Sequence, residues 1–198
     1  MASLKILDIR VDKVDMMGAL CVVDSFVQEG GFHHIVTLNA EIIYQAQFNQ
    51  PLKDLINSAD LVTPDGAGIV WAAGFLGEPV PERVTGIDLM LEICKQARHN
   101  GWRIYLLGGS PGVADEAADK LRAQYPNINI VGTHHGYFKE NEEAEVLEKV
   151  RQAEPDLIFV ALGAPRQEFW IRAHIRRSLP VKVAIGVGGS FDVVSLAG

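Results

Sequence analysis

The stretch "RIYLLGGSPGVADEAADKLRAQYPNINIVG", residues 103–132, decides the fold. It opens on a short apolar run, 103–108, which ends in two glycines. A helical pattern follows, and a second apolar run, 128–132, closes the unit. Two strands joined through one helix normally lie parallel in the same sheet. The stretch therefore predicts a strand–helix–strand unit, and the question is how often the chain repeats it.

The same unit recurs on both sides of this stretch. Further apolar runs, rich in Val, Ile and Leu with little alternation, are typical of strands buried on both faces; they are residues 33–38, 60–63, 156–162 and 181–187. Helical patterns cover 16–31, 86–101 and 140–155. The sequence thus predicts an α/β fold: a Rossmann-like, mostly parallel sheet with helices on both faces. Residues 4–15 alternate, which predicts an N-terminal β-hairpin or edge strand.

Two helices allow more detailed predictions. In the helix over 86–101, one apolar stripe is predicted to face the core; it holds Ile87, Met90, Leu91, Cys94 and Ala97. In the unit quoted above, Ser110 is a candidate N-cap for the helix that follows it.

Composition limits the classes of protein that fit. The 198 residues contain no linker or internal repeat, so we expect one domain over 1–198. The net charge of −7 argues against nucleic acid as a partner, because phosphate binding needs a basic surface. The opening "MASLKILDIR" is no secretory signal, which favours a cytoplasmic location. No apolar run reaches the roughly 18 residues of a membrane span, although peripheral contact stays open.

Ligands of such sheets bind beyond the carboxyl ends of the strands. The segments found there are "TLNAE" (37–41), "TPDGAG" (63–68), "GGSPG" (108–112), "THHGYF" (133–138), "GAPRQE" (163–168) and "GGSFD" (188–192). Polar and glycine-rich residues gather at this edge. They are either a ligand site or the ordinary loops of any α/β sheet.

The loop 108–112 is typical of anion binding, because glycines let backbone N–H groups approach a phosphate. It lacks the Lys-Ser/Thr of a Walker loop and the spacing of a dinucleotide fingerprint. No acid follows the next strand to hold a ribose hydroxyl, so a nicotinamide cofactor is disfavoured. A nucleoside diphosphate is not disfavoured by these absences. Arg83 and Arg166 are the candidate cations for its charge.

A metal site is not predicted. Histidines pair at 33–34 and 134–135, but neighbours on a strand point to opposite faces and cannot share one ion. The sequence also lacks Asp-x-Asp, the motif with which many sugar-nucleotide enzymes hold a cation.

Carboxylate chemistry is the remaining option. No Gly-x-Ser-x-Gly elbow occurs, and neither Cys21 nor Cys94 lies at a strand end. Asp65 directly follows a buried-type strand inside a glycine-flanked turn. A side chain placed there can face the ligand and act as a general base.

These segments, in order and with natural spacing, resemble the TagA/WecG/CpsF glycosyltransferases, which build bacterial surface polymers on a lipid carrier. The resemblance runs from about Val36 to Val193. Its specific parts are "TPDGAGIVWAAGFLGEPVPERVTGIDL" (63–89) and "GAPRQE", and it is greatest to members that add N-acetylmannosamine in the linkage unit of teichoic acids.

The resemblance implies an inverting, metal-independent transfer from UDP-ManNAc to polyprenyl-diphosphate-GlcNAc, with no cofactor. Asp65 would be the base that deprotonates the acceptor hydroxyl, and Arg83 would contact the diphosphate or a substrate hydroxyl. Thr37, Asn39 and Gln167 would line the sugar pocket. The residues implied to hold UDP are Gly108, Gly109, Ser110, Gly136, Tyr137, Gly188, Gly189, Phe191 and Asp192.

Three alternatives remain at this point. The donor could carry N-acetylmannosaminuronic acid for another surface polysaccharide. The chain could be a nucleotide-sugar epimerase or dehydrogenase, or a nucleotide-binding module without catalysis.

The chain stops at Gly198, soon after "GGSFDVVS", where family members continue with a basic C-terminal tail. We expect that tail to be missing here. Through it the resemblance implies a peripheral position at the inner face of the plasma membrane, with the membrane surface as a partner. An uncovered sheet face is also expected to favour a homo-oligomer.

Overall fold

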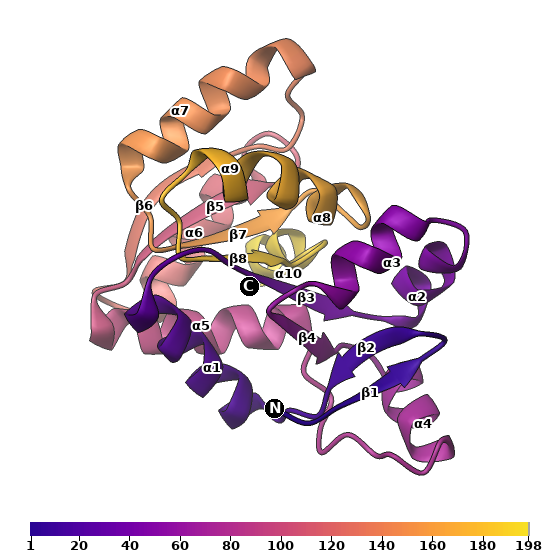
Figure 1. The fold of residues 1–198 in the computed structure, drawn as a ribbon. Coiled ribbons are helices and arrows are strands. Elements are labelled where there is room, and N and C mark those ends of the chain that lie inside the picture. The colour runs from indigo at the N-terminus through magenta and orange to yellow at the C-terminus, as the bar shows by residue number, and fades with distance from the viewer. Residues whose placement is uncertain (198) are drawn as a thin grey trace.

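The computed structural model describes residues 1–197 and is built on a six-stranded sheet (Figure 1). The strand order is β4-β3-β8-β7-β5-β6, and all neighbours run parallel. The strands are β3 (His33–Leu38), β4 (Leu61–Pro64), β5 (Arg103–Gly108), β6 (Asn129–His134), β7 (Leu157–Ala161) and β8 (Val183–Gly186). The predicted parallel sheet is confirmed, and each predicted strand overlaps an observed one.

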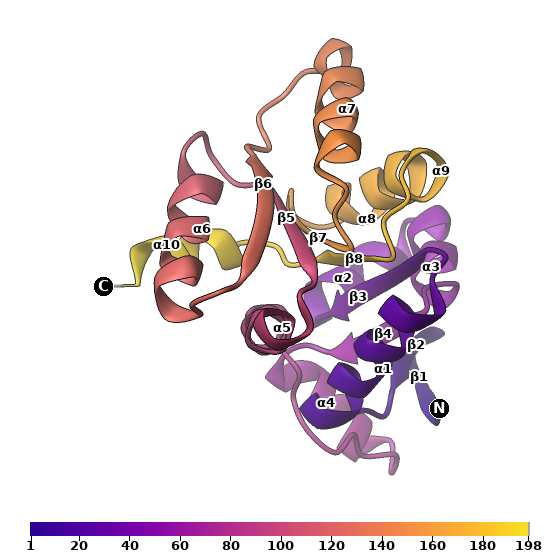
Figure 2. The same cartoon turned by 90° about the vertical axis from the view of Figure 1, so that its left-hand side faces the viewer.

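Helices cover both faces of the sheet, as predicted. One face packs against α1 (Met16–Glu29), α5 (Gly86–Asn100), α6 (Val113–Gln124) and α10 (Ser190–Leu196). The other packs against α2 (Ala40–Gln47), α3 (Gln50–Asn57), η1 (Glu140–Glu142) with α7 (Glu143–Ala153), and α8 (Arg166–Trp170), which runs through η2 (Ile171–Ile175) into α9 (Arg176–Ser178). Figure 2 separates the two layers, with α6 and α10 on one side of β5 and β6 and α7 on the other. Within residues 1–197, no helix is both long and apolar enough to cross a membrane.

Strand β7 shows why the runs lacked alternation. Leu157 and Phe159 point into the core beside α5 and α6, whereas Ile158 and Val160 point into the core beside α7 and η2. All four side chains are fully buried, because both faces of the strand are covered. An apolar residue is therefore required at every position rather than at every second one.

Helix α5 differs in detail from its prediction. Met90, Cys94 and Ala97 are buried as expected, but Leu89 and Ile93 complete the buried face. Ile87 and Leu91 lie at its margin and are only partly buried. The predicted stripe was turned by part of a helical turn, since the helix packs on its neighbours through a wider face than one stripe.

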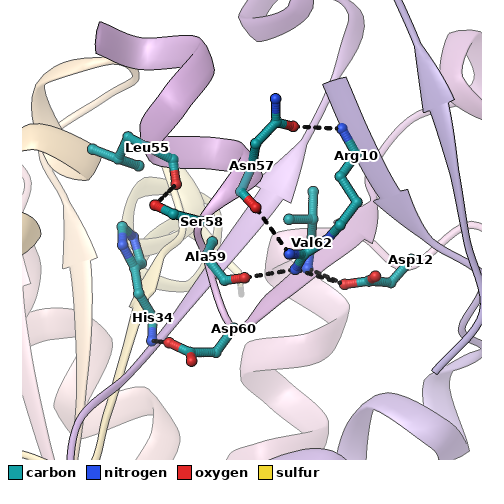
Figure 3. Close-up of polar contacts among 9 residues, drawn as sticks. All are labelled: Arg10, Asp12, His34, Leu55, Asn57, Ser58, Ala59, Asp60 and Val62. Carbon is teal, nitrogen blue, oxygen red and sulfur yellow. Dashed lines mark hydrogen bonds and ion pairs between the residues drawn. The ribbon is translucent and has the colours of Figure 1, made fainter. Parts of the chain in front are cut away.

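The N-terminal residues form a hairpin of their own, β1 (Ser3–Ile6) and β2 (Ile9–Asp12), with antiparallel pairing. The hairpin prediction is confirmed, whereas the edge-strand alternative is wrong, since the pair forms a separate two-stranded sheet. Arg10 and Asp12 fasten this hairpin to the sheet (Figure 3). Arg10 donates to the carbonyls of Asn57 at 3.1 Å and Ala59 at 2.6 Å, while Asp12 accepts from the Val62 N–H at 2.8 Å.

Candidate active site

Two adjoining hollows lie at the carboxyl ends of the strands. The first, of about 330 Å³, is called here the glycine-loop hollow; it is lined by Gly109, Ser110, Gly136, Tyr137, Ala161, Leu162, Gly163, Arg166, Gly188, Gly189 and Asp192. The second, of about 390 Å³, is called the Asp65 hollow; it is lined by Thr37, Asn39, Glu41, Ile42, Asp65, Gly163, Ala164, Gln167, Val187, Gly188 and Gly189. Gly163, Gly188 and Gly189 line both, so the hollows are two parts of one cleft.

Close backbone contacts build the glycine-loop hollow. Gly108 has φ +138°, and a Cβ added there would lie 2.3 Å from the carbonyl oxygen of Ala161. The Gly109 N–H donates to that same oxygen at 3.0 Å, and the Gly136 N–H donates to the Gly109 carbonyl at 2.8 Å. Three loops are thereby held together at the point where a ligand would touch backbone.

Ser110 lies in this hollow but does not cap the helix. Helix α6 begins at Val113, and Gly112 is its N-cap residue without a side-chain cap. The N-cap prediction for Ser110 was wrong, because the chain makes a turn first, closed by the Val113 N–H donating to the Ser110 carbonyl at 3.0 Å.

Asp65 follows β4 and lines the hollow that bears its name. Its backbone N–H donates to the Leu38 carbonyl at 2.8 Å, and its Oδ2 accepts from the Gly86 N–H at 3.2 Å. Burial raises the pKa of the carboxyl above its usual value. The Gly86 hydrogen bond and the charge of Arg83 act against this rise, while Asp88 adds to it. A carboxylate with a raised pKa is a stronger proton acceptor than an ordinary aspartate.

Thr37 and Asn39 come from β3 and from the start of α2. The Thr37 hydroxyl donates to the Gly186 carbonyl at 2.8 Å, which ties β3 to β8. Asn39 is the N-cap of α2, and its Oδ1 accepts from the Ile42 N–H at 2.9 Å. Both side chains are therefore fixed before any ligand arrives.

Gln167 is buried at the start of α8 and reaches the same hollow. Its Oε1 accepts from the Gly188 N–H at 3.1 Å, and its Nε2 donates to Glu168 Oε1 at 3.0 Å. Glu168 is fully buried, and burial raises its pKa to about 7, against the opposing effect of the Gln167 hydrogen bond. Its Oε2 has no hydrogen-bond partner among residues 1–197.

Glu168 is the residue of this site that the sequence did not single out. The sequence placed it in the segment "GAPRQE" beyond a strand, but did not predict that it would be buried. A Cβ on Gly186 would lie 2.6 Å from Glu168 Oε1 and 2.7 Å from Gln167 Nε2, so a glycine in β8 makes room for both side chains. Glu168 lies on α8 and faces Gly186 on β8. This proximity can be recognised only when the positions of α8 and β8 in the fold are known.

Three of the implied site residues do not line either hollow. Arg83 is exposed and acts on Asp65 through its charge. Phe191 is fully buried in the core beside Gly109. Gly108 is the last residue of β5 and packs against the backbone of Ala161. The roles implied for these residues, and for those that do line the hollows, stay predictions.

Charged groups face the glycine-loop hollow from two sides. Arg166, a candidate cation from the sequence, is exposed and lines the hollow, with its guanidinium 5.5 Å from the centre of the Phe138 ring. Asp192 lines the same hollow, and so does Tyr137, an exposed aromatic residue. The hollow thus offers a cation, a carboxylate and an aromatic face together.

The reason given against a metal at His134 and His135 was wrong. Strand β6 ends at His134, so His135 is no longer on the strand, and the two ring centres lie 4.6 Å apart. Among residues 1–197, no group of three His, Cys, Asp or Glu side chains is arranged to hold a metal ion.

Residues 4–197 match the glycosyl transferase WecG/TagA/CpsF family, and the chain belongs to it. A relative from Bacillus spizizenii, named N-acetylglucosaminyldiphosphoundecaprenol N-acetyl-beta-D-mannosaminyltransferase, is 38% identical over 161 residues. That alignment covers 81% of this chain and 62% of the relative, less than two thirds of its length. A protein of the same name from Staphylococcus aureus (strain MRSA252) is 36% identical over 194 residues, or 97% of this chain and 75% of the relative. Because the chain belongs to a glycosyltransferase family, the epimerase and dehydrogenase alternatives are rejected.

Proposed function

We propose that this chain transfers N-acetylmannosamine from UDP-ManNAc to a polyprenyl-diphosphate-linked GlcNAc, with inversion. The observation that carries the proposal is the partly buried Asp65, which lines one hollow while a nucleotide-sized, glycine-lined hollow adjoins it. The relatives' names support the choice of sugars, since they print a GlcNAc-diphosphoundecaprenol acceptor and an N-acetyl-β-D-mannosaminyl group.

In the proposed reaction Asp65 takes the proton of the acceptor hydroxyl. The oxygen then forms a bond to the anomeric carbon, while the bond from that carbon to the UDP oxygen breaks and UDP leaves with the electron pair. A single displacement on an α-linked UDP-sugar gives a β product, which agrees with the β linkage printed in the relatives' names. The raised pKa of Asp65 favours this proton transfer.

The glycine-loop hollow suits the UDP part. The Gly109 and Gly188 loops carry no bulky side chain at these glycines, so a phosphate can approach their backbone closely, and Arg166 supplies a forked cation. Asp192 suits ribose hydroxyls, which donate to a carboxylate, and Tyr137 offers a face for the uracil ring. Because Arg166 can balance the diphosphate and the chain lacks Asp-x-Asp, we include in the proposal that no divalent cation is required.

The Asp65 hollow favours a neutral sugar over its uronic acid. Among the described residues that line it, Glu41 and Asp65 are acidic and none is basic. A sugar carboxylate placed there would be repelled by two carboxylates in a partly desolvated site. The lining therefore supports N-acetylmannosamine as the transferred group.

A lipid-linked acceptor requires the enzyme to work at a membrane surface. We include in the proposal a peripheral position at the inner face of the plasma membrane, where UDP-sugars are available on the cytoplasmic side. The printed acceptor of the relatives, a diphosphoundecaprenol, supports a membrane-bound substrate.

The test is Asp65→Asn, assayed on the full-length protein for UDP release from UDP-ManNAc with a lipid-GlcNAc acceptor. Loss of the base is expected to lower kcat by about 10²–10⁴-fold, with UDP binding unchanged. Asp54→Asn is the matched control, because Asp54 is exposed on α3 and lines neither hollow. Near-wild-type turnover of Asp65→Asn would contradict the assignment of the base.

A further inference from the structure

Helix α4 (Ala67–Phe75) is apolar on all sides, yet it lies at the surface. Its sequence "AGIVWAAGF" contains no charged side chain. Ile69 and Ala73 are buried with the residues of the β1–β2 hairpin, and α4 contacts β1 (Figure 1). A helix that is apolar all round is normally buried in a core or in lipid. The outer half of α4 has no such cover within residues 1–197.

The uncovered side carries three large apolar side chains that are exposed. Trp71 is 70% exposed, Phe75 78% and Leu76 53%. Trp71 and Phe75 lie one turn apart, and their rings stack with centres 5.5 Å apart and planes 13° from parallel. These three residues are called here the α4 patch. The stacking of Trp71 on Phe75 leaves most of this apolar surface open to water, which is unfavourable without a partner.

The size of the α4 patch argues against a second protein chain as the partner. Two aromatic side chains of roughly 150–250 Å² each and one leucine amount to about 500 Å². A standard protein interface takes roughly 800 Å² from each partner. Lipid hydrocarbon needs no complementary surface, and tryptophan is favoured at the boundary of a bilayer, where its ring is apolar and its N–H meets water.

The α4 patch lies close to the Asp65 hollow along the chain. Gly66, the N-cap of α4, directly follows Asp65, and a Cβ on Gly68 would lie 3.5 Å from Ala40, next to Asn39. Nine helical residues span about 14 Å, so the patch begins within that reach of the Asp65 hollow. The chain then returns through Arg83 to Gly86, which holds Asp65.

The acidic groups beside the patch already have partners. Glu78 pairs with Lys13 at 2.8 Å, and Glu82 accepts from the Met16 N–H at 2.9 Å. This matters because the chain has a net charge of −7, and a bacterial membrane surface is itself anionic. Glu78, two residues beyond Leu76, therefore meets a membrane as part of an ion pair, which lowers the repulsion between its charge and an anionic surface.

We propose that the α4 patch inserts into the hydrocarbon boundary of a lipid bilayer and so sets the Asp65 hollow at headgroup level. The inference rests on the proposed function, because an acceptor on a polyprenyl diphosphate presents its sugar just outside the bilayer. The contact involves only residues of this chain and is separate from the basic tail that the resemblance associates with the family. It orients the cleft toward the membrane, whereas a tail alone would only tether it.

Tryptophan fluorescence tests the contact on the 198-residue chain. Trp102 and Trp170 are buried, so Trp71 is the exposed one of the three tryptophans. Vesicles of phosphatidylcholine and phosphatidylglycerol in equal parts are expected to shift the emission to shorter wavelength. Trp71→Phe is expected to abolish the shift but to keep sedimentation with the vesicles.

A triple variant, Trp71→Gln/Phe75→Gln/Leu76→Gln, is expected to lower vesicle binding by more than about tenfold, because it removes the inserted apolar area. Its fold is checked by circular dichroism and by UDP binding, which should not change. The matched control is Val193→Gln/Leu196→Gln on α10, a pair that is also exposed and apolar but lies away from α4 in both views (Figures 1 and 2). The control is expected to bind vesicles like the unaltered chain.

Absence of vesicle binding, or an equal loss in the α10 control, would overturn the inference. So would a Trp71 shift that follows protein concentration without vesicles, which would identify a second copy as the partner. Turnover on a short, water-soluble GlcNAc acceptor separates the two proposals. Turnover without vesicle binding rejects this inference alone, while vesicle binding without turnover supports it and counts against the proposed reaction.

Discussion

Glu168 is a buried acid that supports the cleft without lining it. It accepts a hydrogen bond from Gln167, which in turn accepts from the Gly188 N–H in the loop shared by both hollows. Its pKa of about 7 means that the protonated form is favoured over the range in which an unfolded glutamate is ionised. The carboxyl therefore links the protonation of a buried group to the position of the Gly188 loop.

The pH dependence of stability follows from that raised pKa. Between the ordinary glutamate pKa of 4.5 and the raised pKa of about 7, the folded chain binds a proton that the unfolded chain has lost. The contribution of Glu168 to the free energy of unfolding is therefore constant below pH 4.5. The free energy of unfolding then falls as the pH rises from 4.5 to about 7. Glu168→Gln keeps an acceptor for Gln167 and removes the titration.

We expect the free energy of unfolding of Glu168→Gln to gain roughly 1–3 kcal/mol relative to the unaltered chain between pH 4.5 and 7.5. Urea unfolding at several pH values measures the difference. Exposed Glu145→Gln on α7 serves as the control and should not show a gain that grows with pH. Parallel pH curves for Glu168→Gln and the unaltered chain would exclude a buried, titrating Glu168.

At the scale of elements, the backbones of β5 and β7 are in close contact at Gly108 and Ala161. A Cβ there would lie 2.3 Å from one backbone atom of Ala161 and 2.5 Å from another, and backbone cannot move aside as a side chain can. The φ of +138° is also one that residues other than glycine rarely adopt. The strand ends, and with them the glycine-loop hollow, depend on this contact.

Gly108→Ala is expected to destabilise the fold by roughly 2–4 kcal/mol through the clash and the strained φ. Gly74→Ala is the matched control: it lies inside α4 and nothing is within 4 Å of its Cβ position. That change should be neutral or stabilise by about 0.5–1 kcal/mol, because alanine is the better helix former. Equal thermal midpoints for the two variants would contradict the close approach.

The elements themselves were largely predictable from the sequence, and their contacts were not. Strands such as 156–162 could be predicted because a strand buried on both faces is apolar at nearly every position. Asp65 could be placed at the site because it directly follows a strand. The resemblance implied that Asp65 and Gln167 belong to one site. The hydrogen bond that fixes Gln167 there, from the Gly188 N–H, depends on β8 lying between β3 and β7. Glu168 escaped notice because its burial is set by Gly186 on another strand. The exposed face of α4 escaped notice because an apolar helix normally predicts a core position.

At the scale of the whole molecule, the cleft joins loops from both halves of the sheet. UDP bound there would contact the chain near Gly109 and near Gly188, so it would stabilise the folded state as a unit. At a UDP concentration of 100 times Kd the gain is about 2.7 kcal/mol, or roughly 5–10 °C in Tm for a chain of this size.

We expect this UDP-induced rise in Tm to be the same with EDTA and with Mg²⁺, and to be absent with NADH. Differential scanning fluorimetry measures all three conditions. Arg166→Gln should reduce the rise, whereas Arg122→Gln, an exposed arginine on α6, should leave it intact. A rise that appears only with Mg²⁺ would show that a cation, and not Arg166, balances the diphosphate.

The position of β8 has a consequence for synthesis on the ribosome. β8 pairs with β3 on one side and β7 on the other, and among the described strands no other pairing joins β3–β4 to β5–β6–β7. Until residues 183–186 leave the exit tunnel, the nascent chain holds two part-sheets with open edges and a cleft without its Gly188 loop. The growing chain is then most exposed to wrong strand pairing, because unpaired edges invite it. Chaperone demand should therefore be highest before residues 183–186 emerge and fall once this central strand is in place.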